Sequence, residues 1–214
     1  MSHQYERCSL ENWRKLWRKL GSTANVAPAW TTLVTTYARP ERKYHNLHHI
    51  VYCLEKFDAT HKLFLRPDIA ELVLWYHDSV YDPKAPDNEE QSLLWLQKDV
   101  TTLAPKLKLN LAGELLLATK HKAKAKGDVA LVQDIDLSIL GAAPAQFEAY
   151  DHAIRQEYQW VDTQTYQTER AKVLRKLGTP PIFTTTHFRE RLEAQAVINI
   201  AQAIQNLRRS YNKL

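Results

Sequence analysis

The sequence predicts an all-α fold, built as one bundle of roughly nine or ten helices. Apolar residues recur every three or four positions along nearly the whole chain, which is the spacing of a helix face. Only five of the 214 residues are glycine, which disfavours a sheet with many tight turns. The chain is 44% hydrophobic and holds six tryptophans, enough for a sizeable core. No repeat, linker or composition break is visible, so residues 1–214 are expected to form a single domain.

The first predicted helix follows Ser9, a residue type that caps helix N-termini, and stops at Gly21. Its apolar stripe is formed by Leu10, Trp13, Leu16, Trp17 and Leu20. The opposite face carries arginines and lysines, which we interpret as a solvated surface. A helix lying on a membrane surface is the less favoured alternative.

Prolines and glycines delimit several of the remaining helices. Pro28 suits the first turn of a helix, and Pro40 prevents its continuation. Gly178 closes a later helix. The predicted ranges are, in chain order, 28–38, 44–64, 67–77, 88–100, 111–121, 129–140, 144–160, 165–177 and 185–212. A loop rich in aspartate and proline follows residue 77.

Net charge and cysteine content indicate which partners and which cellular compartment to expect. The net charge of +5 suits an anionic small molecule, a nucleic acid or an acidic lipid surface without choosing among them. Cys8 and Cys53 are isolated, which favours a reducing compartment. The first twenty residues lack the apolar core of a signal peptide, and no segment has the roughly 18 apolar residues of a membrane span. We therefore expect a cytoplasmic protein without a membrane partner. No nucleotide-binding glycine motif is present.

Three histidines stand close together in Tyr44-His45-Asn46-Leu47-His48-His49. On a helix, His45 shares a face both with His48 and with His49, so one or two of these rings could enter the same cavity. The alternative is a polar helix face.

The dipeptide His77-Asp78 ends a strongly apolar helical segment, residues 70–76. A buried carboxylate beside an imidazole is costly unless both have a partner. A cation is a natural partner, because histidine supplies nitrogen and aspartate supplies hard oxygen. The alternative is a helix end with both side chains in solvent.

Two further aspartates, Asp134 and Asp136, interrupt an apolar stretch. Charged groups in such a stretch need a cation, a salt bridge or solvent. If the segment is helical, the two carboxylates lie on different faces. The pattern alone leaves open which of them would bind a cation.

Six segments in a fixed order resemble one family. They are RKYHNLHHI (42–50), WYHDSVYD (75–82), DNEEQS (87–92), ATKHK (118–122), DIDLSILG (134–141) and IRQEY (154–158). Together they resemble the HD superfamily of metal-dependent phosphohydrolases, and more closely its bacterial subfamily of predicted metal-dependent HD phosphohydrolases. The resemblance covers about residues 30–200 and implies an all-α HD-type domain.

The resemblance implies roles for several residues of the motifs. The implied metal ligands are His49, His77, Asp78 and Asp136. Asp136 is preferred to Asp134 because it matches the family's final aspartate before L-S-I-L. His45 would act as general acid, and Asp78 would serve catalysis as well as metal binding. His48 falls at a variable position. One or two divalent ions are expected, with Mn, Fe, Co, Ni, Zn and Mg not distinguished.

Five further residues are candidates for substrate binding: Arg42, Glu89, Lys120, His121 and Arg155. A guanidinium fork matches phosphate oxygens, and lysine attracts anions. The alternatives are a surface salt bridge for Arg42, a first-turn helix carboxylate for Glu89 and an internal ion pair for Arg155.

The implied reaction is hydrolysis of a phosphoester or phosphoanhydride, in a nucleotide or a related small molecule. A bound metal ion would activate water and polarise a phosphoryl oxygen. The principal alternative is a non-catalytic HD-type nucleotide-binding or regulatory module. A structural metal is a third interpretation, disfavoured because the ligand set contains no thiolate. No nucleic-acid-binding motif is visible. The amphipathic last helix leaves a homo-oligomer open.

Overall fold

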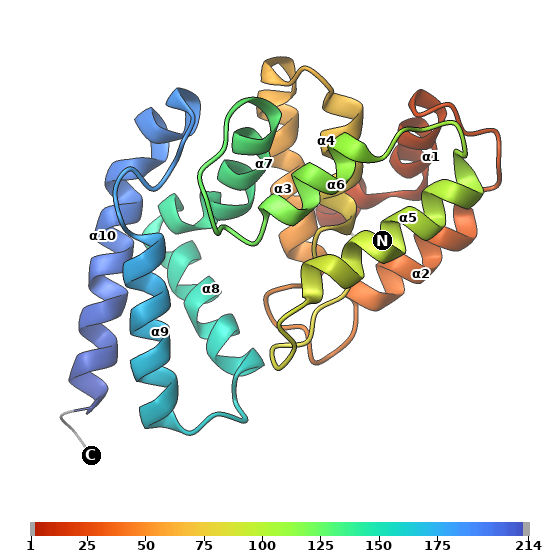
Figure 1. The fold of residues 1–214 in the computed structure, drawn as a ribbon. Coiled ribbons are helices and arrows are strands. Elements are labelled where there is room, and N and C mark those ends of the chain that lie inside the picture. Colours follow the sequence, from red (N-terminus) through yellow and green to blue (C-terminus); the bar gives the residue numbers. More distant parts are fainter. Residues whose placement is uncertain (1–2, 212–214) are drawn as a thin grey trace. The chain divides into compact units, whose positions relative to one another are not determined.

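A computed structural model describes residues 3–211, and over this range the chain forms ten α-helices and three short 3-10 helices, with no strand (Figure 1). The prediction of an all-α bundle of nine or ten helices is therefore confirmed. The α-helices are α1 Leu10–Lys19, α2 Ala27–Tyr37, α3 Leu47–Thr60, α4 Pro67–Tyr76, α5 Asn88–Leu103, α6 Asn110–Ala118, α7 Gly127–Leu137, α8 Pro144–Glu157, α9 Thr163–Leu177 and α10 Thr186–Tyr211. The 3-10 helices are η1 His3–Cys8, η2 His61–Leu63 and η3 Ser138–Gly141.

Most helix ends lie where the sequence predicts them. Ser9 caps α1, because its hydroxyl accepts a hydrogen bond from the backbone N–H of Asn12 at 3.3 Å. Gly21, just after α1, has a φ of +86°, a conformation that favours glycine. Pro67 stands in the first turn of α4, where its missing N–H is not needed. The capping and proline rules therefore locate these boundaries well.

The helix that carries the histidine cluster begins later than predicted. Its predicted start was residue 44, but α3 begins at Leu47. The cause is Asn46, which has extended backbone and accepts a hydrogen bond from the N–H of His48 at 2.9 Å. This is an N-cap, so His45 precedes the helix. The predicted range to residue 64 is divided between α3 and η2.

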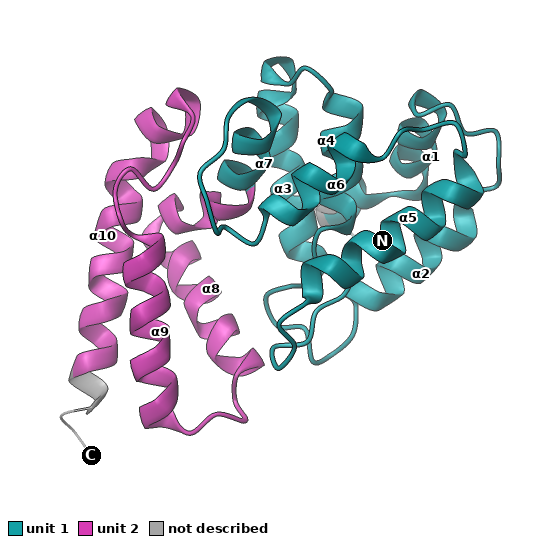
Figure 2. Cartoon of the chain, viewed as in Figure 1, with its two compact units in different colours: residues 1–135 teal, residues 136–214 magenta. Residues whose placement is uncertain are grey.

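The chain divides into two compact units, residues 1–135 and 136–214 (Figure 2). The division falls inside the continuous helix α7, between Ile135 and Asp136. The first unit holds α1 to α6 and most of α7. The second holds η3 and α8 to α10. A single domain stays a prediction.

Helix α4 is the centre of the first unit. It contacts α1, α3, α5 and α6, and each of its residues from Ile69 to Tyr76 is buried. A helix that is apolar on every side must be enclosed by its neighbours. The ring of Trp75 meets that of Trp13 edge to face at 5.0 Å between centroids. The C-terminal end of α4 therefore delivers its next residue, His77, into the interior.

The second unit packs the long helix α10 against α9 and η3. The buried amide of Asn199 donates to the carbonyls of Leu140 and Ala142 at 2.9 and 2.8 Å. Gly141 lies so close to α10 that a Cβ at this position would stand 2.6 Å from the Cβ of Leu192. These contacts tie η3 to the middle of α10.

Helix α10 has 26 residues and would be long enough to cross a bilayer. It carries charged residues along its length, including Arg189, Glu190 and Arg191. Among the helices of residues 3–211, none combines this length with the apolar character of a membrane span.

Candidate metal centre

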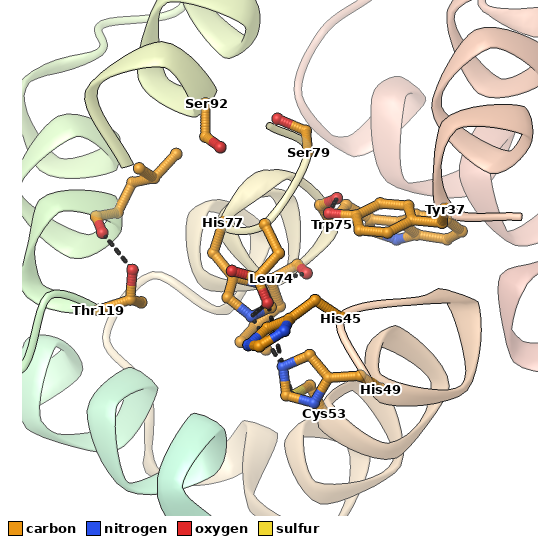
Figure 3. Close-up of polar contacts among 12 residues, drawn as sticks. Tyr37, His45, His49, Cys53, Leu74, Trp75, His77, Ser79, Ser92 and Thr119 are labelled. Atoms are coloured by element: carbon orange, nitrogen blue, oxygen red, sulfur yellow. Dashed lines mark hydrogen bonds and ion pairs between the residues drawn. The ribbon is translucent and has the colours of Figure 1, made fainter. Parts of the chain in front are cut away.

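His49, His77 and Asp78 bring three potential ligand atoms together in the first unit. The Nε2 atoms of His49 and His77 are 3.1 Å apart. One carboxylate oxygen, Oδ2 of Asp78, lies 3.1 Å from the Nε2 of His77 and 3.3 Å from that of His49. Figure 3 shows the two rings together, with His45 and Cys53 beside them. The sequence predicts all three of these ligands.

The spacing of these three atoms fits a shared divalent ion. Nitrogen and oxygen ligands lie about 2.1 Å from zinc and similar ions, so two of them are about 3.0 Å apart at a right angle and about 3.4 Å apart at a tetrahedral angle. The observed separations of 3.1 to 3.3 Å fall between these values. Two imidazoles and one carboxylate also form a donor set that such ions accept.

Helix α3 places His49 in the interior. The ring is on the buried face of the helix, next to Ile50 and one turn before Cys53, and the residue is 3% exposed. The cap at Asn46 fixes where the helix begins, and therefore which residues face inward.

His77 is oriented by the end of α4. It is 1% exposed, and its Nδ1 lies 3.0 Å from the carbonyl oxygen of Leu74. An Nδ1–H that donates to this carbonyl leaves the lone pair on Nε2, the atom that faces His49 and Asp78. Metal-binding histidines are oriented in this way by a hydrogen bond from their other nitrogen.

The carboxyl group of Asp78 is held in its charged form. Burial by itself would raise its pKa, but when the imidazoles carry a proton on Nε2, the charge of His77 and hydrogen bonds from His49 and His77 hold the pKa well below its usual range. A divalent cation in place of these protons would lower the pKa in the same way. The charge of His45 acts in the same direction. Asp78 is therefore an anionic oxygen donor at neutral pH, as a hard cation requires.

Helix α7 carries Asp136, and its preceding residues, up to Ile135, belong to the first unit. One ligand atom each from His49, Cys53, His77 and Asp136 all lie within 4.8 Å of one another, so this group could hold a metal ion. Asp134 is also on α7 and is 1% exposed, but among the described residues it is not part of this group. Of the two aspartates, Asp136 therefore belongs to this group and Asp134 does not, which fits the prediction that they lie on different faces of a helix.

Cys53 is a neighbour of the site that the sequence interpretation missed. Its Sγ is 3.7 Å from Nε2 and 3.8 Å from Nδ1 of His49. A thiolate sharing an ion with Nε2 would lie clearly closer to Nε2 than to Nδ1, so the thiol packs against the ring instead. The sequence does indicate this contact, because Cys53 follows His49 by four residues and the two therefore share one helix face.

His45 lies next to the ligand group without being on α3. Its ring stacks on Tyr81, with centroids 3.8 Å apart and planes 23° from parallel, and its centroid is 6.1 Å from that of His49. The neighbouring His48 is exposed and contacts Tyr5 through Nε2. The two residues therefore occupy different environments.

Arg42 is buried, and its hydrogen bonds in the described structure go to backbone carbonyls. Nη1 donates to His45 at 3.1 Å and to Asp78 at 2.6 Å, and Nη2 donates to Ser79 at 2.9 Å. The guanidinium also lies over the ring of Tyr37, 5.1 Å from its centroid. Phosphate binding by Arg42 stays a prediction.

Glu89 and Lys120 lie next to each other. The ammonium of Lys120 is 3.6 Å from the carboxylate of Glu89 and 2.5 Å from that of Glu90, both in the first turn of α5. The hydrogen bond to Glu90 raises the pKa of Lys120. His121 follows with a φ of +49°. This group could present one cation and two carboxylates to a ligand.

Arg155 belongs to the second unit and contacts its own neighbourhood. It donates to the carbonyls of Tyr158 and Val161 at 2.7 and 3.1 Å, and its guanidinium lies 4.5 Å from the ring centroid of Tyr166. These contacts hold the turn after α8. Substrate binding by Arg155 stays a prediction.

Comparisons with known proteins identify no relative. No family model, no curated protein and no solved structure matches the chain. Membership of the HD superfamily therefore stays a prediction. The case for function depends on the geometry of the ligand group.

Proposed function

We propose that the protein is a metal-dependent phosphohydrolase of the HD type. The observation that carries this proposal is the convergence of the Nε2 atoms of the two buried histidines, His49 and His77, with Oδ2 of the partly exposed Asp78, at 3.1 to 3.3 Å. A buried set of this kind without a thiolate ligand is typical of ions that activate water or polarise an oxygen.

Four residues would hold the ion: His49, His77, Asp78 and Asp136. Asp78 is preferred to Cys53 because its oxygen approaches both Nε2 atoms, whereas the thiol lies against the His49 ring. When bound, a divalent ion would supply Lewis acidity to a water molecule and to a phosphoryl oxygen.

His45 would supply the proton that the departing oxygen needs. An imidazole suits this task because its ordinary pKa, about 6.5, is close to neutral pH. The stacking on Tyr81 holds the ring in one orientation, and the hydrogen bond from Arg42 holds its backbone. A general acid of this kind works only when its distance from the leaving group is fixed.

Lys120 is the cation that we propose for an anionic substrate, in competition with two carboxylate partners. It lies between the carboxylates of Glu89 and Glu90, which keep it charged and ordered. A phosphate group would compete with these carboxylates for the ammonium. We propose a nucleotide or a related small phosphorylated molecule as substrate, bound as an anion.

Metal analysis combined with turnover tests the proposal. The purified chain is loaded with Mn²⁺, Co²⁺, Zn²⁺ or Mg²⁺ and incubated with a panel of nucleotides and phosphomonoesters, and phosphate release is measured. Asp78→Asn is expected to abolish turnover. Glu11→Gln makes the same chemical change at an exposed carboxylate and should leave turnover intact.

Two results would contradict the proposal. One is an Asp78→Asn variant that keeps its metal and full turnover, which would show that Asp78 takes no part in metal binding or catalysis. The other is a wild-type chain that binds a nucleotide but hydrolyses nothing in the panel with any of the four ions, which would support the regulatory module instead.

A further inference from the structure

Arg42 connects two segments that carry site residues. One segment precedes α3 and contains His45. The other follows α4 and contains Asp78 and Ser79. Nη1 donates to the carbonyls of both His45 and Asp78, so a single nitrogen bridges the two backbones. Nη2 adds a bond to Ser79. The segments are more than thirty residues apart in the sequence, and the guanidinium fixes their separation.

A buried tyrosine ring holds the Arg42 side chain in place. Its guanidinium lies over the ring of Tyr37, which is fully buried. The hydroxyl of Tyr37 donates to the carbonyl of Trp75 at 3.0 Å, two residues before His77. A cation over an aromatic ring is held more firmly in a buried place than at the surface. Arg42 is thereby held at a fixed position relative to the C-terminal end of α4.

Arg42 has few hydrogen-bond donors left for a ligand. A guanidinium has five N–H donors, and both donors of Nη1 and one of Nη2 are directed at carbonyls. The residue is 7% exposed. A phosphate group would have to displace these bonds or approach through the small exposed part.

We propose that Arg42 is a positioning residue that sets the distance between His45 and the His77-Asp78 ligand pair. The inference rests on the proposed function and goes beyond it, because it assigns Arg42 to the backbone and not to the substrate phosphate. It predicts that removing the guanidinium weakens metal binding through Asp78 far more than it weakens the affinity of the metal-saturated protein for phosphate.

Arg42→Met tests this inference with two separate probes. Co²⁺ reports on the ligand geometry through its visible absorption, and its dissociation constant is measured by titration. Inorganic phosphate is then titrated into the Co²⁺-loaded protein. We expect the Co²⁺ affinity to fall about 10- to 100-fold, the usual effect of losing a residue that orients metal ligands. The absorption spectrum should change, and the phosphate affinity of the Co²⁺-saturated protein should change much less than the Co²⁺ affinity.

Two further variants make the result decisive. Arg39→Met makes the same substitution at an exposed arginine three residues earlier and should leave both affinities unchanged. Arg42→Lys keeps the charge but can reach fewer carbonyls, so its Co²⁺ affinity should lie between those of wild type and Arg42→Met. If Arg42→Met does not fold, Arg42→Lys alone decides.

The opposite pattern would overturn the inference: Co²⁺ affinity and spectrum unchanged, with phosphate affinity lost. That result would assign Arg42 to the substrate. Failure of the proposed function is distinguishable, because a wild-type chain that binds Co²⁺ in this site but hydrolyses no phosphate compound rejects the enzyme and leaves the Co²⁺ comparison valid.

Discussion

The Nε2 atoms of His49 and His77 face each other at 3.1 Å, although the residues are 28 positions apart, one on α3 and the other just after α4. Two imidazole nitrogens at this distance cannot both present lone pairs unless a proton or a cation lies between them. Because the carboxylate of Asp78 approaches the same two atoms, a cation satisfies all three groups at once.

Replacing His49 by alanine should lower the affinity for Mn²⁺ or Co²⁺ by more than about 100-fold, beyond the 10- to 100-fold effect typical of residues outside the ligand set. Isothermal titration calorimetry measures this affinity. His48→Ala is the matched control, because it removes the adjacent, exposed histidine. Equal losses in the two variants would argue against a metal ligand at position 49.

His45→Ala should lower kcat by about 10²- to 10⁴-fold, the usual contribution of a general acid, while the metal content stays normal. Steady-state kinetics with a hydrolysed substrate and elemental analysis of the same sample measure both quantities. Tyr81→Leu should lower kcat as well, since the stacked ring is lost, whereas Tyr81→Phe keeps the stacking and most of the activity. A His45→Ala variant with normal kcat would remove the general-acid role.

Asp128→Ala should lower the free energy of unfolding by about 1.5–3 kcal/mol, the usual contribution of hydrogen bonds to a charged group. Its carboxylate accepts from the N–H groups of Leu65 and Arg66, both at 2.8 Å, at the start of α4. Urea denaturation of the metal-free chain measures the change. Asp128→Asn keeps one acceptor oxygen and should be less destabilised than Asp128→Ala. If Asp128→Asn were the more destabilised of the two, these hydrogen bonds would not explain the effect.

Stability should depend on pH through Asp68, whose pKa is lowered by its hydrogen bonds to Arg66. The folded-state pKa is below the unfolded value of about 3.9, so the stabilisation is present above that pH and is lost as pH falls through the folded-state pKa. The Tm of wild type should exceed that of Asp68→Asn at pH 7, and the difference should shrink at pH 3.

Arg66→Gln provides the control for this pH dependence. Without the guanidinium, Asp68→Asn should have a smaller effect on Tm at pH 7, because only the backbone hydrogen bonds from Ile69 and Asp68 still favour the carboxylate. An equally large difference in the Arg66→Gln background would mean that Arg66 is not the main cause of the lowered pKa.

Local rules in the sequence predict much of this fold. The cap at Ser9, the proline at the start of α4 and the period of the apolar residues depend on neighbours within one helix, so they can be read from the chain. The late start of α3 follows from the same physics, because Asn46 is a good N-cap that the period alone does not reveal.

The candidate site is harder to predict from the sequence than the fold. His49 and His77 could be proposed from their order in the chain, but their facing nitrogens depend on how α3 and α4 pack. The role of Arg42 depends on carbonyl groups, which every residue has and no sequence pattern marks. Cys53 has the right spacing from His49, yet only the structure shows on which side of the ring it lies.

The enclosure of α4 has a practical consequence for finding the cognate ion. Because His77 is delivered from the most buried helix of the first unit, unfolding that unit would disperse the ligands and release the ion. An ion present at 100 times its dissociation constant would therefore add about 2.7 kcal/mol to the stability. A thermal-shift screen of divalent cations, with a chelator as reference, could then rank them before any substrate is known.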